Sequence, residues 1–399
     1  MKKIMILGAS VLQLPAILKA KEMGLQVIAV DMNPEAIGFK VEGIQTEVIS
    51  TIDIEKVLEA AKKHNIDGIM TLASDMPMRT VAVVAKELGL VGITEDTAIK
   101  ATNKAVMREC LAQNDVPVPR FNKVRTKEEF IKVVNGFAVN CIVKPADNSG
   151  SRGVVLIDDI NNKELVAEAF EYSRQYSRSG DIVVEEYMTG PEVSVETLSV
   201  NGTCHVIQIT DKLTTGAPNF VEMGHSQPTQ LSEDICNKIK EVTMAANYAV
   251  GIQNGPSHTE IKVTPEGPKI VEIGARLGGD NITTHLVPFS TGVDMVEACI
   301  QIALGEVPNI EGRQSNASAI RYMKNETGVI RTIEGVEEAK NIPGVKQISI
   351  VHNVGSRVGE IHSSVDRVGF VIAQADNQKN AIEICEKALR LIKINVIKE

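Results

Sequence analysis

The sequence contains no tryptophan, and aromatic residues make up only 3% of its 399 positions. Its formal net charge is −9. Proteins that bind single-stranded nucleic acids stack bases on aromatic side chains, and nucleic-acid-binding domains in general carry basic patches. The scarcity of aromatics and the acidic balance therefore argue against a nucleic-acid partner and favour small molecules.

Long hydrophobic runs are also absent. No apolar stretch approaches the roughly 20 residues that a membrane-spanning helix needs, and the first eight residues read as a strand rather than a signal peptide. We therefore expect a cytoplasmic protein without membrane contact. The six cysteines form no Cys-x-x-Cys pair and most lie in apolar runs, so we expect reduced structural thiols.

Two common nucleotide-binding signatures are missing. The order strand, turn, helix, strand and Asp31 near the N-terminus is typical of an open parallel α/β sheet. However, Ser10 and Gln13 stand where the dinucleotide fingerprint requires glycines, which argues against NAD. The Gly/Ser-rich loop at 146–153 has backbone amides suited to phosphate oxygens, but it lacks the Walker pattern.

The length predicts more than one domain, because 399 residues exceed what one hydrophobic core usually organises. We expect an open parallel α/β domain at 1–100, a larger mixed domain at 101–310 and a small α+β unit at 311–399. Asp75 follows the carboxyl end of an N-terminal strand, where open α/β sheets place ligands. It is a candidate substrate contact, with helix capping as the alternative.

A β-hairpin is predicted between His258 and Asp280. Alternating polarity flanks a Pro/Gly-rich turn, and symmetry about Glu266 would place Glu260 directly opposite Glu272. Like charges so placed are destabilising, which predicts a cation between them. Mg²⁺ is commonly held by one or two carboxylates together with substrate phosphates. The alternative is an exposed hairpin with two solvated glutamates.

The chain presents, in order, Lys104 at a helix start, Lys144 at a strand end, the Gly/Ser loop, three glutamates at 185, 186 and 192, and the hairpin with Arg276. This succession resembles the ATP-grasp superfamily, which includes biotin carboxylase and carbamoyl-phosphate synthetase. The resemblance covers nearly the whole chain. It implies an ATP-grasp fold, ATP as cosubstrate and Mg²⁺, with two ions expected and Mn²⁺ as an alternative ion.

The resemblance also implies roles for individual residues. Lys104 and Lys144 would contact the nucleotide phosphates, and Glu260 and Glu272 would bind metal. Gly274 stands where many members have an asparagine, so a third protein ligand is not expected there. The remaining nucleotide contacts would come from a phosphate-covering loop, an adenine-reading hinge and a ribose acceptor: Ser149, Gly150, Ser151 and Gly153; Glu185, Glu186 and Met188; and Glu192.

Within the superfamily, Phe220 to His225 followed by Glu272 to Arg276 looks most like the L-amino-acid ligases. By this match Glu222 would hold an ammonium group and His225 would orient a reacting group or move its proton. Arg276 would hold the acyl phosphate or the substrate carboxylate. Both Glu222 and His225 fall in a polar loop predicted from Asp211 to Gln230. The alternative is a mobile surface loop in which neither residue has a specific role. Asp280 lies four residues beyond Arg276 and suggests a polar or cationic substrate side chain, or a helix cap.

The implied reaction phosphorylates a carboxylate to an acyl phosphate, which an amine substrate then opens. The competing enzyme class is an ATP-dependent carboxylase or formyl-phosphate transferase of purine or biotin type, which Gln13 and Asp31 also resemble. A non-enzymatic ATP-dependent sensor is a further alternative. A homodimer is expected.

Overall fold

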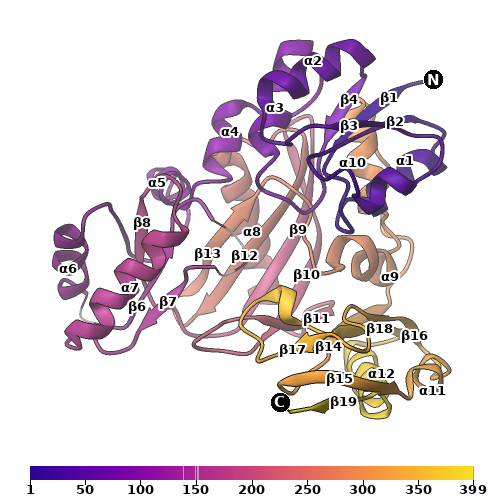
Figure 1. The fold of residues 1–399 in the computed structure, drawn as a ribbon. Coiled ribbons are helices and arrows are strands. Elements are labelled where there is room, and N and C mark those ends of the chain that lie inside the picture. Colours follow the sequence, from indigo (N-terminus) through magenta and orange to yellow (C-terminus); the bar gives the residue numbers. More distant parts are fainter. Residues whose placement is uncertain (138, 149, 151, 399) are drawn as a thin grey trace.

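The computed structural model describes residues 1–137, 139–148, 150 and 152–398. Figure 1 shows the N-terminal unit in indigo at the top, a small magenta sheet at the left, a large central sheet, and the orange and yellow C-terminal unit below. The chain is thus a mixed α/β structure with a parallel sheet at its N-terminus and antiparallel sheets beyond it.

The N-terminal unit is built on a parallel sheet with the strand order β3-β2-β1-β4. Its apolar strand residues are buried, with Ile4 to Leu7 fully so, which explains why the strands read as continuous hydrophobic runs. Its elements are β1 (Lys3–Leu7), α1 (Leu14–Glu22), β2 (Gln26–Asp31), η1 (Ile37–Lys40), β3 (Gln45–Val48), α2 (Ile54–His64), β4 (Gly68–Met70), α3 (Met78–Leu88) and α4 (Glu95–Lys100).

A second, antiparallel sheet has the order β5-β8-β6-β7. Helices α6 and α7 pack on it around a core that includes Phe130, Phe137 and Phe170. Its elements are α5 (Lys104–Gln113), β5 (Phe121–Val124), α6 (Lys127–Asn135), β6 (Cys141–Pro145), β7 (Val155–Ile157), α7 (Lys163–Tyr176) and β8 (Ile182–Glu186).

The largest sheet has eight strands in the order β13-β12-β9-β10-β11-β14-β18-β16. Strand β14 pairs with β11, so this sheet continues across residue 310 and joins the C-terminal unit to the middle of the chain. Its elements up to that point are β9 (Glu192–Val200), β10 (Thr203–Thr214), β11 (Glu222–Gln227), α8 (Glu233–Val250), β12 (Gly255–Thr264), β13 (Gly267–Gly274), η2 (Ile282–Leu286), α9 (Val287–Thr291) and α10 (Met295–Ala303).

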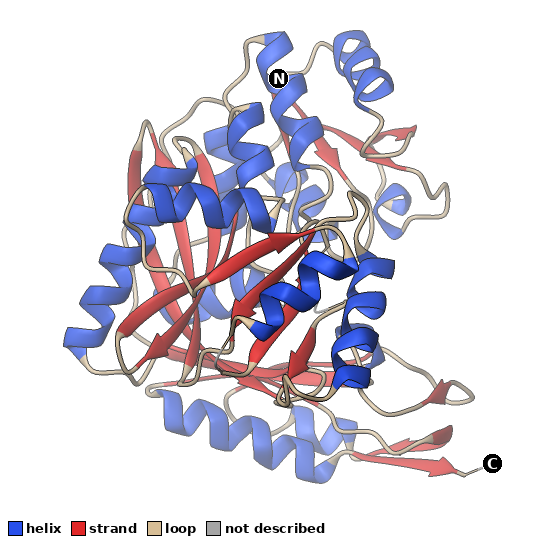
Figure 2. Cartoon of the chain, turned by 90° about the vertical axis from the view of Figure 1, so that its left-hand side faces the viewer, coloured by secondary structure: helices blue, strands red, loops and turns tan. Residues whose placement is uncertain are grey.

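The C-terminal unit adds three strands to the large sheet and forms a small sheet of its own, β17-β15-β19. Figure 2 shows a helix below the large sheet and the short C-terminal strands extending to the lower right. The elements are β14 (Ala317–Tyr322), β15 (Gly328–Glu334), α11 (Val336–Lys340), β16 (Val345–Ile350), β17 (Arg357–Val358), η3 (Ser364–Asp366), β18 (Gly369–Ala375), α12 (Gln378–Leu391) and β19 (Lys393–Ile397).

One segment differs from the sequence-based expectation. The predicted polar loop from Asp211 to Gln230 is wrong, because β10 continues to Thr214 and residues Glu222–Gln227 form β11. The sequence of β11, Glu-Met-Gly-His-Ser-Gln, has little strand propensity. It is a strand because it pairs on one side with β10 and on the other with β14.

All six cysteines are free thiols and five are buried, as expected from the sequence. In the described part of the chain no single helix is long and apolar enough to cross a membrane. The segments Ile282–Thr291 and Met295–Ala303 are long and apolar enough for a membrane span only when they are taken together, and the chain bends by 113° between them.

Gly190 lies between β8 and β9, at a close approach to β12. Its φ is 122°, and a Cβ there would lie 2.0 Å from the carbonyl oxygen of Val263. Gly202 has a φ of 82°, yet a Cβ there would meet nothing within 4 Å. We expect Gly202→Ala to cost about 1–2 kcal/mol for its left-handed backbone and Gly190→Ala to cost more, since the strands must also separate. Urea denaturation of both variants measures this, and equal losses would contradict the close approach.

Candidate active site

A cavity lies between the antiparallel sheet β5-β8-β6-β7 and the eight-stranded sheet, and it is lined by side chains from both. Ten residues predicted from the sequence line it: Lys104, Lys144, Gly150, Glu185, Glu186, Met188, Glu192, Glu222, Glu260 and Glu272. Of the other described candidates, Gly153, His225 and Arg276 are not in its lining. The predicted Ser149 and Ser151 lie outside the described residues. The structure therefore brings most of the predicted nucleotide and metal residues to one place.

The β12–β13 hairpin places the two predicted metal ligands directly opposite each other on neighbouring strands. The register pairs Glu260 with Glu272, as predicted, although a bulge after Glu260 shifts the pairs closer to the turn. Each carboxylate has its own cation. The Nζ of Lys104 lies 2.7 Å from Oε1 of Glu272, and the Nζ of Lys212 lies 3.0 Å from Oε1 of Glu260. The predicted positive charge is thus supplied by two lysines in this structure.

Lys212 was not predicted from the sequence. Its ammonium lies among three carboxylates, 2.7 Å from Glu192, 3.0 Å from Glu260 and 3.6 Å from Glu222. Burial alone lowers the pKa of this lysine, but the three carboxylates overcome that effect and hold its pKa well above the ordinary value. A signal was available, because six predicted glutamates faced only two predicted lysines in one cavity.

The donor set fits a cation that is shared with a nucleotide. Glu260 and Glu272 supply carboxylate oxygens, and the pKa of Glu260 lies well below its usual range because Lys212 and His258 outweigh the effect of burial. Within the described residues no group of three or more His, Cys, Asp or Glu side chains could hold a metal ion by itself. Two carboxylates completed by phosphate oxygens are, however, a common arrangement for Mg²⁺.

Lys144 is held by a buried ion network. Its Nζ lies 2.6 Å from Oε2 of Glu185, and Arg108 donates from Nε to Oε1 of the same carboxylate at 2.6 Å. Arg108 is fully buried and also donates to the carbonyl oxygen of Val271 at 2.6 Å. Both carboxylate oxygens of Glu185 are therefore engaged by cations, and Arg108 was missed because a helical arginine carries no sequence signal of burial.

The end of β8 and the segment that follows it form one wall of the cavity. Glu186 accepts from the backbone N–H of Arg120 at 3.1 Å and from Lys269 at 3.1 Å. Glu192, at the start of β9, is paired with Lys212 and with Lys262, whose Nζ lies 3.1 Å away. This wall thus combines fixed carboxylates with the irregular backbone around Met188.

Arg276 is paired with the N-terminal unit. It donates from Nε to Oδ1 of Asp75 at 2.8 Å and from its second terminal nitrogen to Oδ2 at 3.3 Å. Asp75 therefore binds Arg276 rather than capping α3, whose N-cap is Pro77. Burial alone lowers the pKa of Arg276, and the Asp75 carboxylate more than offsets this.

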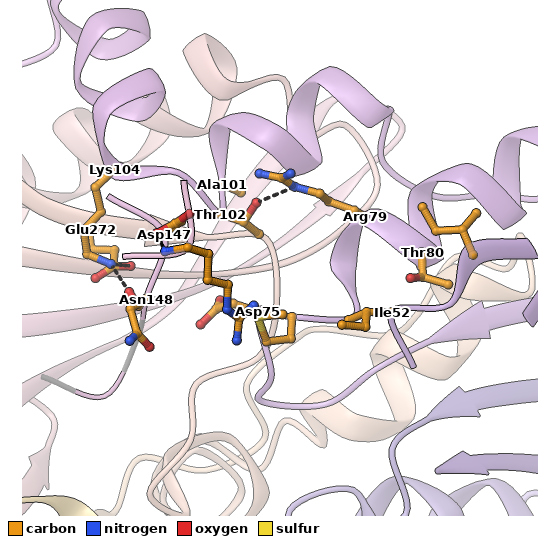
Figure 3. Close-up of a pocket in the computed structure, with 13 residues that line it drawn as sticks. Ile52, Asp75, Arg79, Thr80, Ala101, Thr102, Lys104, Asp147, Asn148 and Glu272 are labelled. Carbon is orange, nitrogen blue, oxygen red and sulfur yellow. Dashed lines mark hydrogen bonds and ion pairs between the residues drawn. The ribbon is translucent and has the colours of Figure 1, made fainter. Parts of the chain in front are cut away.

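Asp75 also lines a second cavity, between the N-terminal unit and the middle of the chain. Figure 3 shows Lys104 and Glu272 beside Asn148 on one side of it, and Arg79 bonded to Thr102 on another. Lys104, Asn148 and Glu272 line both cavities. The Lys104–Glu272 pair therefore forms a wall shared by the two.

His225 and Asp280 meet at the C-terminal side of the site. The Nε2 of His225 lies 3.3 Å from Oδ2 of Asp280, and Arg367 binds both oxygens of Asp280 at 2.8 and 2.7 Å. Burial alone raises the pKa of Asp280, but its hydrogen bonds from Arg367 and His225 bring it well below the usual range. The charge of Asp280 is thus compensated within the chain, which removes the reason to expect a cationic substrate side chain.

His258 lies on β12, two residues before Glu260, and links the hairpin to Glu196 on β9. Its Nδ1 lies 2.6 Å from Oε1 of the fully buried Glu196, and its Nε2 lies 3.6 Å from Glu260. Burial lowers the pKa of His258, but Glu196 and then Glu260 raise it to about 9. The imidazolium form is therefore the stable one at neutral pH.

This raised pKa predicts a pH-dependent stability. The pKa of His258 is higher in the folded state than in the unfolded state, so protonated His258 adds to the free energy of unfolding. This contribution is complete below about pH 6.5 and is lost as pH rises through 9. A difference of this size corresponds to about 3 kcal/mol. Denaturation without nucleotide at a series of pH values should show this decrease in the free energy of unfolding for the wild type and for His362→Gln, whose histidine is exposed. The decrease should be absent in His258→Gln. A parallel decline in both variants would contradict the assignment.

Comparison with known proteins gives two family matches. Residues 137–284 match the ATP-grasp domain, and residues 322–396 match the L-amino acid ligase C-terminal domain 2. The L-arginine-specific L-amino acid ligase of Bacillus subtilis is 24% identical over 311 residues, which cover 77% of this chain and 75% of that protein. The alanine–anticapsin ligase of Bacillus subtilis is 26% identical over 272 residues, 62% of this chain and 56% of that protein.

The crystal structure of an L-amino acid ligase from Bacillus licheniformis superposes with a TM-score of 0.87 at 24% identity, covering 100% of this chain and 99% of that one. The ATP-grasp match contains the Gly/Ser loop and the β12–β13 hairpin, and the second match contains β16 and β18, two of the strands that extend the same sheet. The chain therefore belongs to the ATP-grasp superfamily of ATP-dependent carboxylate–amine ligases and carries the C-terminal domain of its L-amino acid ligases.

Proposed function

We propose that this enzyme is an L-amino acid ligase, which joins the carboxylate of one amino acid to the amino group of another with cleavage of ATP to ADP and phosphate. One observation carries the proposal. The carboxylates of Glu222 and Glu260 both lie close to one ammonium, that of Lys212, at 3.6 and 3.0 Å. A carboxylate that can hold a substrate ammonium therefore lies next to a metal ligand.

The nucleotide is assigned to the cavity between the two sheets. We place its adenine at the wall formed by Glu186 and the backbone around Met188, its ribose at Glu192, and its phosphates near Lys104 and Lys144. The loop from Asn148 to Gly153 would cover the phosphates. Because both oxygens of Glu185 are bound by Lys144 and Arg108, we assign Glu185 to positioning the lysine rather than to reading adenine.

Glu260 and Glu272 would hold Mg²⁺ together with phosphate oxygens, with two ions expected and Mn²⁺ as an alternative. A divalent cation bound there would offset the negative charge of the phosphates during transfer. Lys104, which pairs with Glu272 in this structure, would then be available to the phosphate oxygens, while Lys212 would keep Glu192 and Glu222 as partners. Charge-assisted contacts of this kind stabilise phosphoryl transfer.

We assign the substrate to the phosphate end of the nucleotide cavity, where the second cavity adjoins it (Figure 3). Glu222 would hold the ammonium group of an amino acid. Arg276 would hold a carboxylate, since its planar fork already binds that of Asp75 in this structure. Both contacts are those a zwitterionic substrate requires.

The purine-type carboxylase or formyl-phosphate transferase is the alternative. The residues that suggested it have other partners here. Gln13 donates to the carbonyl oxygen of Leu72 at 2.8 Å, and Asp31 accepts from the backbone N–H groups of Ala9 and Asn33. These bonds hold the first turn of the N-terminal sheet together. The homodimer and the cytoplasmic location stay predictions, the former open to light scattering.

The metal assignment predicts that Glu272→Gln abolishes ATP turnover while the protein stays folded, since one of two carboxylate ligands is lost. Glu260→Gln should weaken turnover severely. Glu266→Gln, in the exposed turn of the same hairpin, is the matched control. Phosphate release at ordinary Mg²⁺ concentration measures all three, and near wild-type release by Glu272→Gln would show that the hairpin is not the metal site.

The ammonium assignment predicts that Glu222→Ala raises the Michaelis constant for an amino-acid substrate about tenfold or more, from the loss of roughly 1.5–3 kcal/mol of charged hydrogen bonding. The constant for ATP should barely change. If the acid substrate is instead bicarbonate or formate, which have no ammonium group, Glu222→Ala should leave its kinetics nearly untouched. That result would favour the purine-type alternative.

A further inference from the structure

Arg367 reaches from the C-terminal unit into the predicted amino-acid site. It lies between η3 and β18, its side chain is only 9% exposed, and it binds Asp280 through two hydrogen bonds of 2.8 and 2.7 Å. It also donates to the carbonyl oxygen of Glu222 at 3.0 Å, and its guanidinium lies 3.7 Å from the ring centre of Tyr322. One arginine therefore contacts three different segments, and its planar fork leaves little freedom to Asp280.

Asp280 in turn holds the ring of His225. Because a carboxylate only accepts hydrogen bonds, the Nε2 of His225, 3.3 Å from Oδ2 of Asp280, must carry a hydrogen. Neutral His225 then has its lone pair on Nδ1. The orientation and the tautomer of the His225 ring are thus set by the Asp280 carboxylate, which Arg367 holds in place. Catalytic bases are commonly oriented in this way by a third group.

The Nδ1 of His225 is a buried nitrogen without a hydrogen-bond partner among the described residues. His225 itself is only 2% exposed. Such an unpaired buried group is costly and uncommon in folded proteins. Register places His225 directly opposite Lys212, which lines the cavity, so the His225 side chain lies on the same face of the sheet as that cavity although His225 is not part of the lining itself. A ligand at this face can supply the missing partner.

We propose that Arg367 and Asp280 are positioning residues for amide formation, which fix His225 with Nδ1 as the atom that receives the proton of the attacking amine. The inference rests on the proposed ligase function and deepens it. It assigns a task to the C-terminal unit, which otherwise only extends the sheet. It also gives Asp280 a role that does not involve contact with the substrate side chain.

The proton balance of the step is simple. The substrate ammonium loses one proton to solvent and its nitrogen attacks the acyl carbon. The new C–N bond forms while the bond between that carbon and the bridging oxygen breaks, and phosphate leaves with the electron pair. The proton still to be lost by nitrogen passes to Nδ1 of His225. Only this last transfer depends on the orientation of the imidazole ring.

Hydroxylamine separates this transfer from the earlier phosphorylation. It is mostly uncharged at neutral pH and opens an acyl phosphate to a hydroxamate without the help of a positioned base. Arg367→Met should therefore lower amide formation tenfold or more while hydroxamate formation and the Michaelis constant for ATP change less than about twofold. Asp280→Asn should behave alike, and Arg331→Met, on the exposed face of β15, should change neither rate.

Three results would overturn the proposal. Equal losses of amide and hydroxamate in Arg367→Met and in the conservative Arg367→Lys would show a merely structural role, and unchanged amide formation in both would show that Arg367 takes no part in the step. The full effect of Arg367→Met in a His225→Gln background would show that Arg367 does not act through His225. A wild-type enzyme that forms no hydroxamate with any amino acid would defeat the ligase proposal itself, a failure seen before any variant is made.

A measurement without turnover gives an independent check. Nitrogen-15 spectra of the imidazole groups, assigned by comparison with His225→Gln, should show the tautomer protonated at Nε2 in the wild type. Arg367→Met and Asp280→Asn should broaden this signal or move it toward the other tautomer. An unchanged signal in both variants would remove Arg367 and Asp280 from the positioning of His225.

Discussion

The structure of the active site depends on the compensation of buried carboxylates by cations from other elements. Glu185 is bound by Lys144 and Arg108, Glu272 by Lys104, and Glu192 and Glu260 by Lys212. A buried charge without a partner costs several kcal/mol, so these pairs allow a cavity lined by acids to fold. In the proposed function the same lysines would contact the phosphates of the nucleotide. Their carboxylate partners and the phosphates would then compete for one set of ammonium groups, and metal bound by Glu260 and Glu272 would favour the phosphates.

The sheets bring these groups together because directly paired residues on neighbouring strands point to the same face. Directly opposed pairs recur along the large sheet: Glu260 with Glu272 across β12 and β13, and Lys212 with His225 across β10 and β11. The sheet then continues through β14 into the C-terminal unit. The proposed metal ligands Glu260 and Glu272 and the proposed ammonium ligand Glu222 thus lie on one continuous sheet, which Arg367 adjoins just before β18, whereas Lys144 belongs to the sheet β5-β8-β6-β7. A small change in strand register would displace several of them at once.

Much of this arrangement was predictable from the sequence. Alternation and turn composition predicted the hairpin and the opposition of its glutamates, and the apolar runs of the N-terminal unit predicted its parallel sheet. The polar strand β11 was not predictable, because its formation depends on pairing with β10 and β14 rather than on its own residues. Lys212, Arg108 and Arg367 were also missed, since long-range ion pairs between distant segments leave no local pattern. The excess of glutamates over lysines in the predicted cavity was the only hint of a further cation.

The neutralisation of Asp280 bears on substrate choice. A carboxylate at this position suggested a polar or cationic substrate side chain when only the sequence was considered. In the structure Arg367 takes both of its oxygens, and His225 adds a third contact. A cationic side chain placed there would have to displace a bidentate guanidinium, and it would meet the positive charge of Arg367 nearby. Asp280 lines neither cavity, and its charge is compensated by Arg367 and His225, so it is better suited to orienting a histidine than to selecting a substrate.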